Sequence, residues 1–162
     1  MTDDPNAAGI WLNGRIPVLY KPVWPDRLLV RLPSAPLFHD TRLYLRGRNG
    51  RLASWLARYG AWELPRSRFD ELARLLLARY RKLYIIQIWR EMQKCAPACW
   101  EAQGMDCECS CMGRNHGSGQ ALNHVIGETF AFEWGPRQFS CRLLQSTARR
   151  LNGHHHDPDP AV

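Results

Sequence analysis

The most regular pattern of apolar positions runs from Phe69 to Tyr80. Apolar side chains recur there at intervals of three and four residues, which places them on one face of a helix. They are Phe69, Leu72, Ala73, Leu76, Leu77 and Tyr80. Asp70 and Glu71 fall in the first turn, where carboxylates interact favourably with the helix dipole. The pattern predicts an amphipathic helix over this stretch, with Ser67 as its N-cap.

A second, shorter helix is predicted just before Gly60. Leu52, Trp55, Leu56 and Tyr59 have the spacing i, i+3, i+4 and i+7, which also describes one helical face. Gly60 follows the last of these residues, at a position where helices commonly end. We therefore expect an amphipathic helix over residues 52–59.

Several apolar runs have the length and composition of β-strands. Residues 16–22 and 27–33 read as two short strands, 62–65 as a short extended segment and 83–89 as a mostly buried strand rich in branched and aromatic side chains. Prolines punctuate the first two runs, and a proline cannot donate to a neighbouring strand. These two strands are therefore expected at the edge of a sheet.

Residues 125–134 and 137–145 predict a C-terminal hairpin around the turn at Gly135. Side chains alternate between the two faces of a strand, so Phe139, Cys141 and Leu143 share one face of the second strand. Cys141 is accordingly expected to be a small buried apolar side chain rather than a metal ligand.

Together these elements predict an α+β fold. We expect a small mixed domain of short strands and two amphipathic helices, with an inserted Cys-rich metal-binding module and a C-terminal β-hairpin. The expected segments are a disordered lead over 1–10, a basic α+β region over 11–94, the metal-binding module over 95–120, the hairpin over 121–150 packed on the same core, and a disordered tail over 151–162.

The strongest chemical signal is a cluster of thiols with one imidazole. Five of the six cysteines and a histidine fall within 22 residues: Cys95, Cys99, Cys107, Cys109, Cys111 and His116. Zinc is commonly bound by such groups, and a structural zinc takes four of them. The preferred set is Cys95, Cys99, Cys107 and Cys109, with Cys111 and His116 as alternates. A site of three cysteines and His116 is the competing arrangement.

Other interpretations of the cluster remain open. Four thiolates in a compact segment also suit an iron–sulfur cluster, although the Cys-x-Cys-x-Cys run matches neither common ferredoxin spacing. A catalytic zinc would need an open coordination position, and the familiar deaminase and His-Glu-x-x-His signatures are absent. A disulfide framework is disfavoured because we expect a cytoplasmic protein, in a reducing compartment. No reaction is predicted.

The charge is +7 and is unevenly distributed along the chain. Residues 1–94 hold 17 Lys and Arg against 8 Asp and Glu, whereas the cysteine region is net acidic. A basic surface suits phosphate backbones. We therefore expect nucleic-acid binding by arginines of the first half, namely Arg46, Arg48, Arg51, Arg66, Arg68, Arg74, Arg79 and Arg81.

The same charge also suits an acidic protein partner. In that alternative the chain is an accessory or inhibitor module with a structural zinc, of the kind that phages and mobile elements encode. No apolar run approaches the roughly 18 residues of a membrane span, so we expect no membrane association. The sequence makes no prediction about the oligomeric state.

Overall fold

One mixed sheet organises the protein. The computed structural model describes residues 5–23, 27–33, 44–46, 53–102, 104–112, 115 and 124–147. Within them, seven strands lie in the order β3-β4-β2-β1-β5-β7-β6. They are β1 (Val18–Lys21), β2 (Arg27–Arg31), β3 (Ser54–Leu56), β4 (Ala61–Pro65), β5 (Lys82–Ile88), β6 (His124–Trp134) and β7 (Arg137–Ser146). The pair β1 and β5 is parallel, and the other neighbouring pairs are antiparallel.

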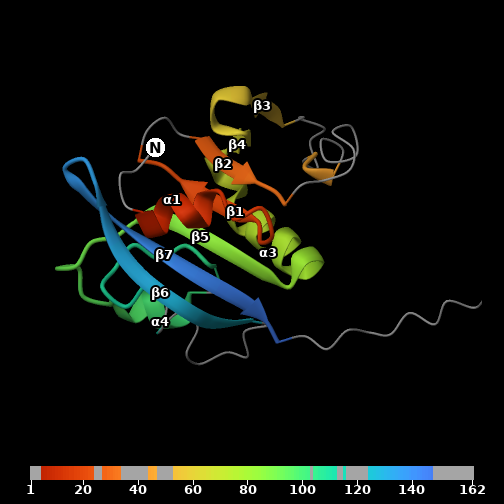
Figure 1. Ribbon diagram of the computed structural model, residues 1–162. Coiled ribbons are helices and arrows are strands. Elements are labelled where there is room, and N and C mark those ends of the chain that lie inside the picture. Colours follow the sequence, from red (N-terminus) through yellow and green to blue (C-terminus); the bar gives the residue numbers. More distant parts are fainter. Residues whose placement is uncertain are drawn as a thin grey trace, which may run out of the picture.

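The two faces of the sheet carry different layers (Figure 1). Helix α3 (Phe69–Tyr80) packs on one face against side chains such as Leu19, Ile85 and Leu144. The short helix α1 (Pro5–Trp11) lies on the other face, where Tyr20 and Phe139 belong to its apolar cluster. Because side chains alternate along each strand, consecutive residues of a strand pack against opposite layers. We call these surfaces the α3 face and the α1 face.

The apolar periodicities located most of these elements correctly. The helix predicted from Phe69 to Tyr80 is confirmed, and its buried residues follow the expected stripe. The predicted strands and the C-terminal hairpin are confirmed as well. The expected edge position of the first two strands is wrong, because β1 and β2 lie inside the sheet and are each paired on both sides, and their prolines fall outside the paired residues. The predicted N-cap is wrong, because Ser67 lies within the 3-10 turn η2 (Arg66–Arg68) and Arg68 occupies the cap position without a side-chain cap hydrogen bond.

The helix predicted over residues 52–59 is wrong. Ser54–Leu56 form β3, and Ala57–Tyr59 form the 3-10 turn η1. Trp55 pairs with Trp62 across the two strands, and their ring centroids are 5.2 Å apart. Gly60 has φ of +57°, which allows the chain to turn directly into β4. The contact between Trp55 and Trp62 thus stabilises a strand at a position where the helical spacing of four apolar residues predicted a helix.

Two further expectations are corrected by the structure. Residues 5–10, predicted as part of a disordered lead, belong to helix α1, in which Ala7 and Trp11 are buried. The α+β class is confirmed, but the description as short strands is wrong for the hairpin, whose strands have 11 and 10 residues. The hairpin extends the sheet through β7, which pairs with β5 along seven positions from Lys82 to Ile88.

Candidate metal centre

The first two cysteines are placed by a single helical turn. Helix α4 (Pro97–Glu101) begins with a proline at its first position, where no backbone N–H is required. The backbone N–H of Cys99 donates to the carbonyl of Ala96 at 2.8 Å. Cys95 immediately precedes this turn, so the spacing of four residues brings both sulfurs to the same side.

The other three thiols lie on the segment that follows α4. This segment is held to the preceding chain by backbone hydrogen bonds from Arg90 to Glu108 (2.8 Å) and from Ser110 to Gln93 (3.0 Å). It then turns back, because the N–H of Met112 donates to the carbonyl of Cys109 at 3.1 Å and Met112 has φ of +48°. The turn brings Cys111 towards α4.

Four sulfur atoms converge on one point. The Sγ atoms of Cys95, Cys99, Cys109 and Cys111 all lie within 4.8 Å of one another, and these four cysteines can hold a metal ion. Cys109 is 3.6 Å from Cys95, 3.7 Å from Cys99 and 3.3 Å from Cys111. Sulfurs at the corners of a tetrahedron with metal–sulfur bonds of about 2.3 Å are about 3.8 Å apart. The observed separations approach that value.

Cys107 is the fifth thiol of the cluster and lies on its inner side. Its sulfur is 3.4 Å from that of Cys109 and 3.6 Å from that of Cys111. It is buried, whereas Cys95, Cys99 and Cys111 are half-buried. The four-sulfur group therefore contains Cys111 in place of Cys107, which the sequence had favoured. His116 lies outside the described residues.

Serine substitution should separate the roles of these two cysteines. Cys111→Ser is expected to lower the metal content, because it removes one of the four converging sulfurs. Cys107→Ser is expected to retain the metal and to lose about 1–3 kcal/mol of stability by burying a hydroxyl. Metal analysis of the two purified variants checks this assignment, and the reverse pattern would restore Cys107 as a ligand.

Burial and neighbouring thiols make the cysteines of the cluster difficult to deprotonate. Burial raises the pKa of the Cys99 thiol, and its neighbours Cys109, Cys107 and Cys111 raise it further. Several thiolates so close together repel one another, and a divalent ion reverses this effect by binding the deprotonated form. The cluster is thus suited to exchanging protons for a metal.

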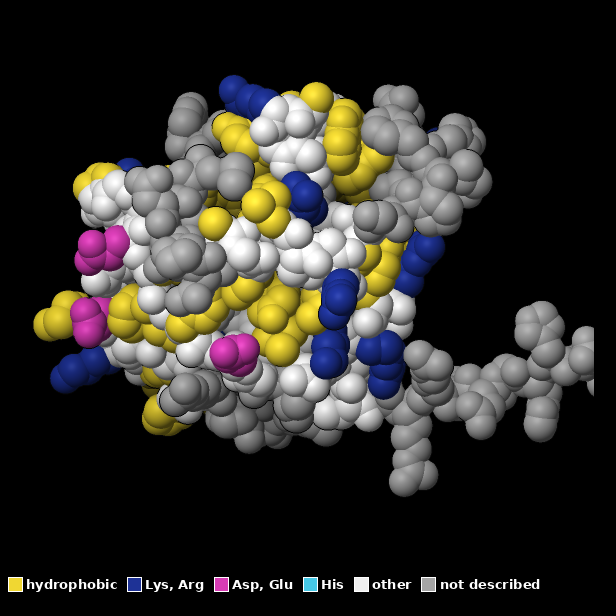
Figure 2. All heavy atoms as spheres, in the orientation of Figure 1, with side chains coloured by type: hydrophobic (Ala, Val, Ile, Leu, Met, Phe, Trp, Pro, Cys, Tyr) yellow, Lys and Arg dark blue, Asp and Glu magenta, His cyan; other side chains and the backbone are white. Residues whose placement is uncertain are grey.

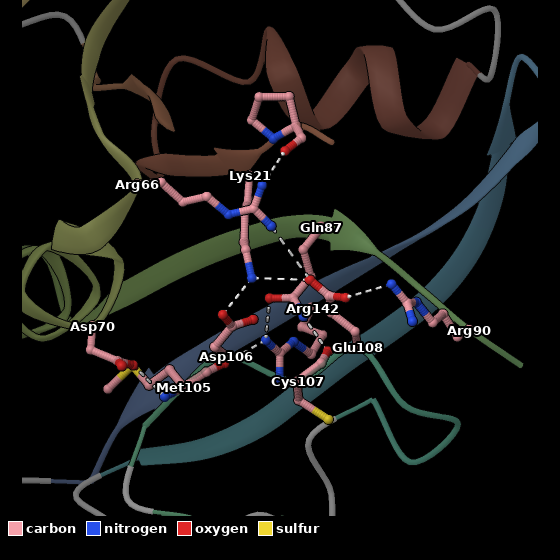
Figure 3. Close-up of polar contacts among 11 residues, drawn as sticks. Lys21, Arg66, Asp70, Gln87, Arg90, Met105, Asp106, Cys107, Glu108 and Arg142 are labelled. Carbon is pink, nitrogen blue, oxygen red and sulfur yellow. Dashed lines mark hydrogen bonds and ion pairs between the residues drawn. The ribbon is translucent and has the colours of Figure 1, made fainter. Parts of the chain in front are cut away.

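Two acidic residues of this segment, Asp106 and Glu108, bind the cysteine segment to the sheet (Figure 3). The ammonium group of Lys21 on β1 is buried and contacts both Asp106 and Glu108, the latter at 3.0 Å. Glu108 also lies 3.7 Å from Arg66 and 3.7 Å from Arg90. Three basic residues of the first half, Lys21, Arg66 and Arg90, therefore lie against acidic residues of the cysteine segment.

Arg142 on β7 forms a second, deeper anchor. Its side chain is 2 % exposed and donates to the carbonyl of Met105 at 2.7 Å and to that of Met112 at 3.4 Å. It also donates at 3.0 Å to Gln87 on β5, whose amide donates in turn to the carbonyl of Cys107. Burial lowers the pKa of the guanidinium, and the nearby thiol of Cys107 opposes that shift.

Helix α3 supplies the third contact to this segment. The Asp70 carboxylate accepts a hydrogen bond from the backbone N–H of Met105 at 2.6 Å. A Cβ added at Gly104 would lie 2.8 Å from the same carboxylate, so any larger residue there would require the Asp70 side chain to shift. Met105 itself joins the apolar cluster beneath α3. Three strands and one helix thus hold the cysteine segment on the α3 face.

Cys141 lies away from this cluster. It is 1 % exposed within the apolar cluster of the α1 face, beside Phe139, as its strand position predicted. Burial raises the pKa of its thiol to about 12.

The arginines predicted to bind nucleic acid have different environments. Arg46, Arg74 and Arg79 are exposed, whereas Arg66 and Arg81 are half-buried. Arg48 and Arg51 lie outside the described residues. Arg68 is buried, forms a two-point ion pair with Glu71 and donates at 2.7 Å to the carbonyl of Leu45.

Comparisons with protein-family models, curated proteins and solved structures found no match. Among the described residues, no helix is long and apolar enough to span a membrane.

Proposed function

We propose that this chain is a zinc-stabilised protein that binds nucleic acid through arginines on and beside α3. The convergence of four cysteine sulfurs carries the first part of the proposal. Four thiolates without a carboxylate or water ligand are typical of structural zinc sites. The second part rests on the exposed arginines and on the net charge of +7.

The sulfur geometry favours a single ion over a cluster of several irons. In a multi-iron cluster each cysteine binds its own iron from the outside, which keeps the sulfurs farther apart than around one shared ion. Here Cys95 and Cys99 both lie within 3.7 Å of Cys109. Zinc accepts four thiolates in a tetrahedral arrangement and needs no further ligand.

The metal acts as a structural staple in this proposal. Four protein ligands leave no position for a substrate or an activated water, which a catalytic zinc requires. The cysteine segment also has few buried apolar side chains of its own, and Trp100 within it is 50 % exposed. Zinc binding contributes on the order of 10 kcal/mol to the folding of small zinc modules, which is ample to order this segment.

Two segments distant in sequence contribute the proposed phosphate contacts. The hydroxyl of Tyr44 donates at 3.0 Å to the carbonyl of Leu75, which brings residues 44–46 against α3. The guanidinium of Arg79 lies over the Tyr44 ring, 4.3 Å from its centroid. Arg46 and Arg74 are also exposed, Arg46 on the first of these segments and Arg74 on α3. Arginine held in this way can bind phosphate with less loss of side-chain freedom.

Salt dependence tests the nucleic-acid proposal. The wild-type protein should bind labelled single- and double-stranded DNA or RNA more weakly as salt rises from about 50 to 200 mM, because bound phosphates release counterions. In the Arg74→Gln/Arg79→Gln double variant, the slope of log affinity against log salt should fall by roughly one per lost contact. Fluorescence anisotropy measures both quantities.

The matched control is the Arg15→Gln/Arg137→Gln double variant, which removes the same charge at two exposed positions away from α3. It should retain most of the wild-type slope. Affinity that ignores salt, or equal losses in the two double variants, would contradict a site on α3. A host protein that remains bound after nuclease treatment, with no nucleic-acid affinity, would favour the acidic protein partner instead.

A further inference from the structure

A separate pocket lies on the α1 face, on the opposite side of the sheet from the cysteine cluster. Its volume is about 230 Å³, and it is lined by α1 and by residues of β1, β2, β3, β4, β5 and β6. The strands form its floor, and Ala7, Ala8 and Trp11 of α1 form one wall. Figure 2 views the α1 side, where hydrophobic side chains lie at the surface between separate Lys and Arg side chains.

Aromatic side chains give this pocket a flat, preformed shape. Tyr20 stacks on Trp134 with ring centroids 5.4 Å apart and an interplanar angle of 24°. Trp11 meets Tyr20 edge to face at 6.1 Å, and Phe132 lies among the same lining residues. Trp11, Tyr20 and Phe132 are all buried, so their positions are fixed by packing. Such walls favour a planar aromatic ligand.

The polar groups of the lining define the charge of the ligand. Arg27 and Arg58 are exposed residues that line the pocket, so their guanidinium groups are accessible to solvent and to a ligand. Arg58 lies over the ring of Tyr59, 4.5 Å from its centroid. Glu63 also lines the pocket and is half-buried. Two arginines against one carboxylate favour a ligand with a single negative charge and disfavour a second one.

We propose that this pocket binds a planar aromatic monoanion, such as an aryl carboxylate. The aromatic rings of the ligand lie against Trp11, Tyr20 and Trp134, and its carboxylate pairs with Arg27 or Arg58. An apolar cavity of about 150 Å³ accommodates benzene, so the larger space here suits a bicyclic ligand of about ten to thirteen non-hydrogen atoms. The inference is independent of the metal and of nucleic-acid binding, because it uses the other face of the sheet.

The test uses 2-naphthoate and its neutral counterpart 2-naphthalenemethanol as probes, with binding measured by calorimetry and by tryptophan fluorescence. The wild-type protein should bind 2-naphthoate roughly tenfold more tightly than the neutral probe, because charge-assisted hydrogen bonds form only with the carboxylate. The Arg27→Gln/Arg58→Gln double variant should lose this preference and keep its affinity for the neutral probe.

Two further variants keep the test specific. Ala8→Phe places a large side chain in the pocket and should abolish binding of both probes, with far-UV circular dichroism verifying the fold. Arg15→Gln changes the charge outside the pocket and should leave both affinities unchanged. The proposal is overturned if 2-naphthoate does not bind the wild-type protein, if Ala8→Phe binds it equally well, or if the arginine double variant keeps the tenfold preference.

Discussion

Cys99→Ser and Cys109→Ser are each expected to release the metal and to detach residues 95–112 from the sheet. Both sulfurs belong to the four-sulfur group, and Cys109 contacts each of the other three within 3.7 Å. Loss of a structural metal is among the few single changes that cost more than about 4 kcal/mol. Metal content and chemical denaturation of the purified variants measure the two effects.

Cys141→Ser provides the matched control for this prediction. It makes the same chemical change at a buried thiol of the opposite face. This variant should lose about 1–3 kcal/mol through burial of a hydroxyl and retain all of its metal. Equal metal content in the three variants would show that the four-sulfur group is not a metal site.

Arg142→Met is expected to have the second largest effect. The substitution keeps much of the side-chain volume but removes the donors to Met105, Met112 and Gln87. Buried acceptors without partners are costly, and removal of one partner from a buried charged network costs roughly 3–5 kcal/mol. Urea denaturation measures this loss. Amide hydrogen exchange should show faster opening of residues 104–112.

Arg137→Met on the same strand is the control, since Arg137 is exposed. A surface substitution of this kind changes stability by about 0.5 kcal/mol or less. If Arg142→Met is as stable as Arg137→Met, the buried guanidinium does not anchor the cysteine segment. The position of that segment on the α3 face would then depend on its other contacts, among them those of Lys21 and Asp70.

Local patterns were sufficient for the elements that bury a regular stripe. The spacing from Phe69 to Tyr80 identifies α3, and the alternation around Gly135 identifies the hairpin, because burial on one side imposes those periods. The spacing of Leu52 to Tyr59 failed because four apolar positions also fit a strand and a turn. Its cross-strand partner Trp62 decides between them.

The arrangement of the candidate site required the tertiary structure. Lys21 and Glu108 are 87 positions apart, and no local pattern connects a lysine in an apolar strand with an acid between two cysteines. The sequence contained one indication that Arg142 is buried. Arg142 is two residues before Leu144 on the same strand, so both side chains point to the same face, and Leu144 is buried. The choice between Cys107 and Cys111 also depends on the turn at Met112, whose positive φ the composition does not reveal.

Elemental analysis of anaerobically purified protein, combined with its absorption spectrum, tests the central claim most directly. A single zinc held by Cys95, Cys99, Cys109 and Cys111 predicts one zinc per chain and no visible absorption bands. Removal of that zinc with a chelator should unfold the cysteine segment. Iron with visible bands, or a folded cysteine segment that contains no metal, would contradict the account.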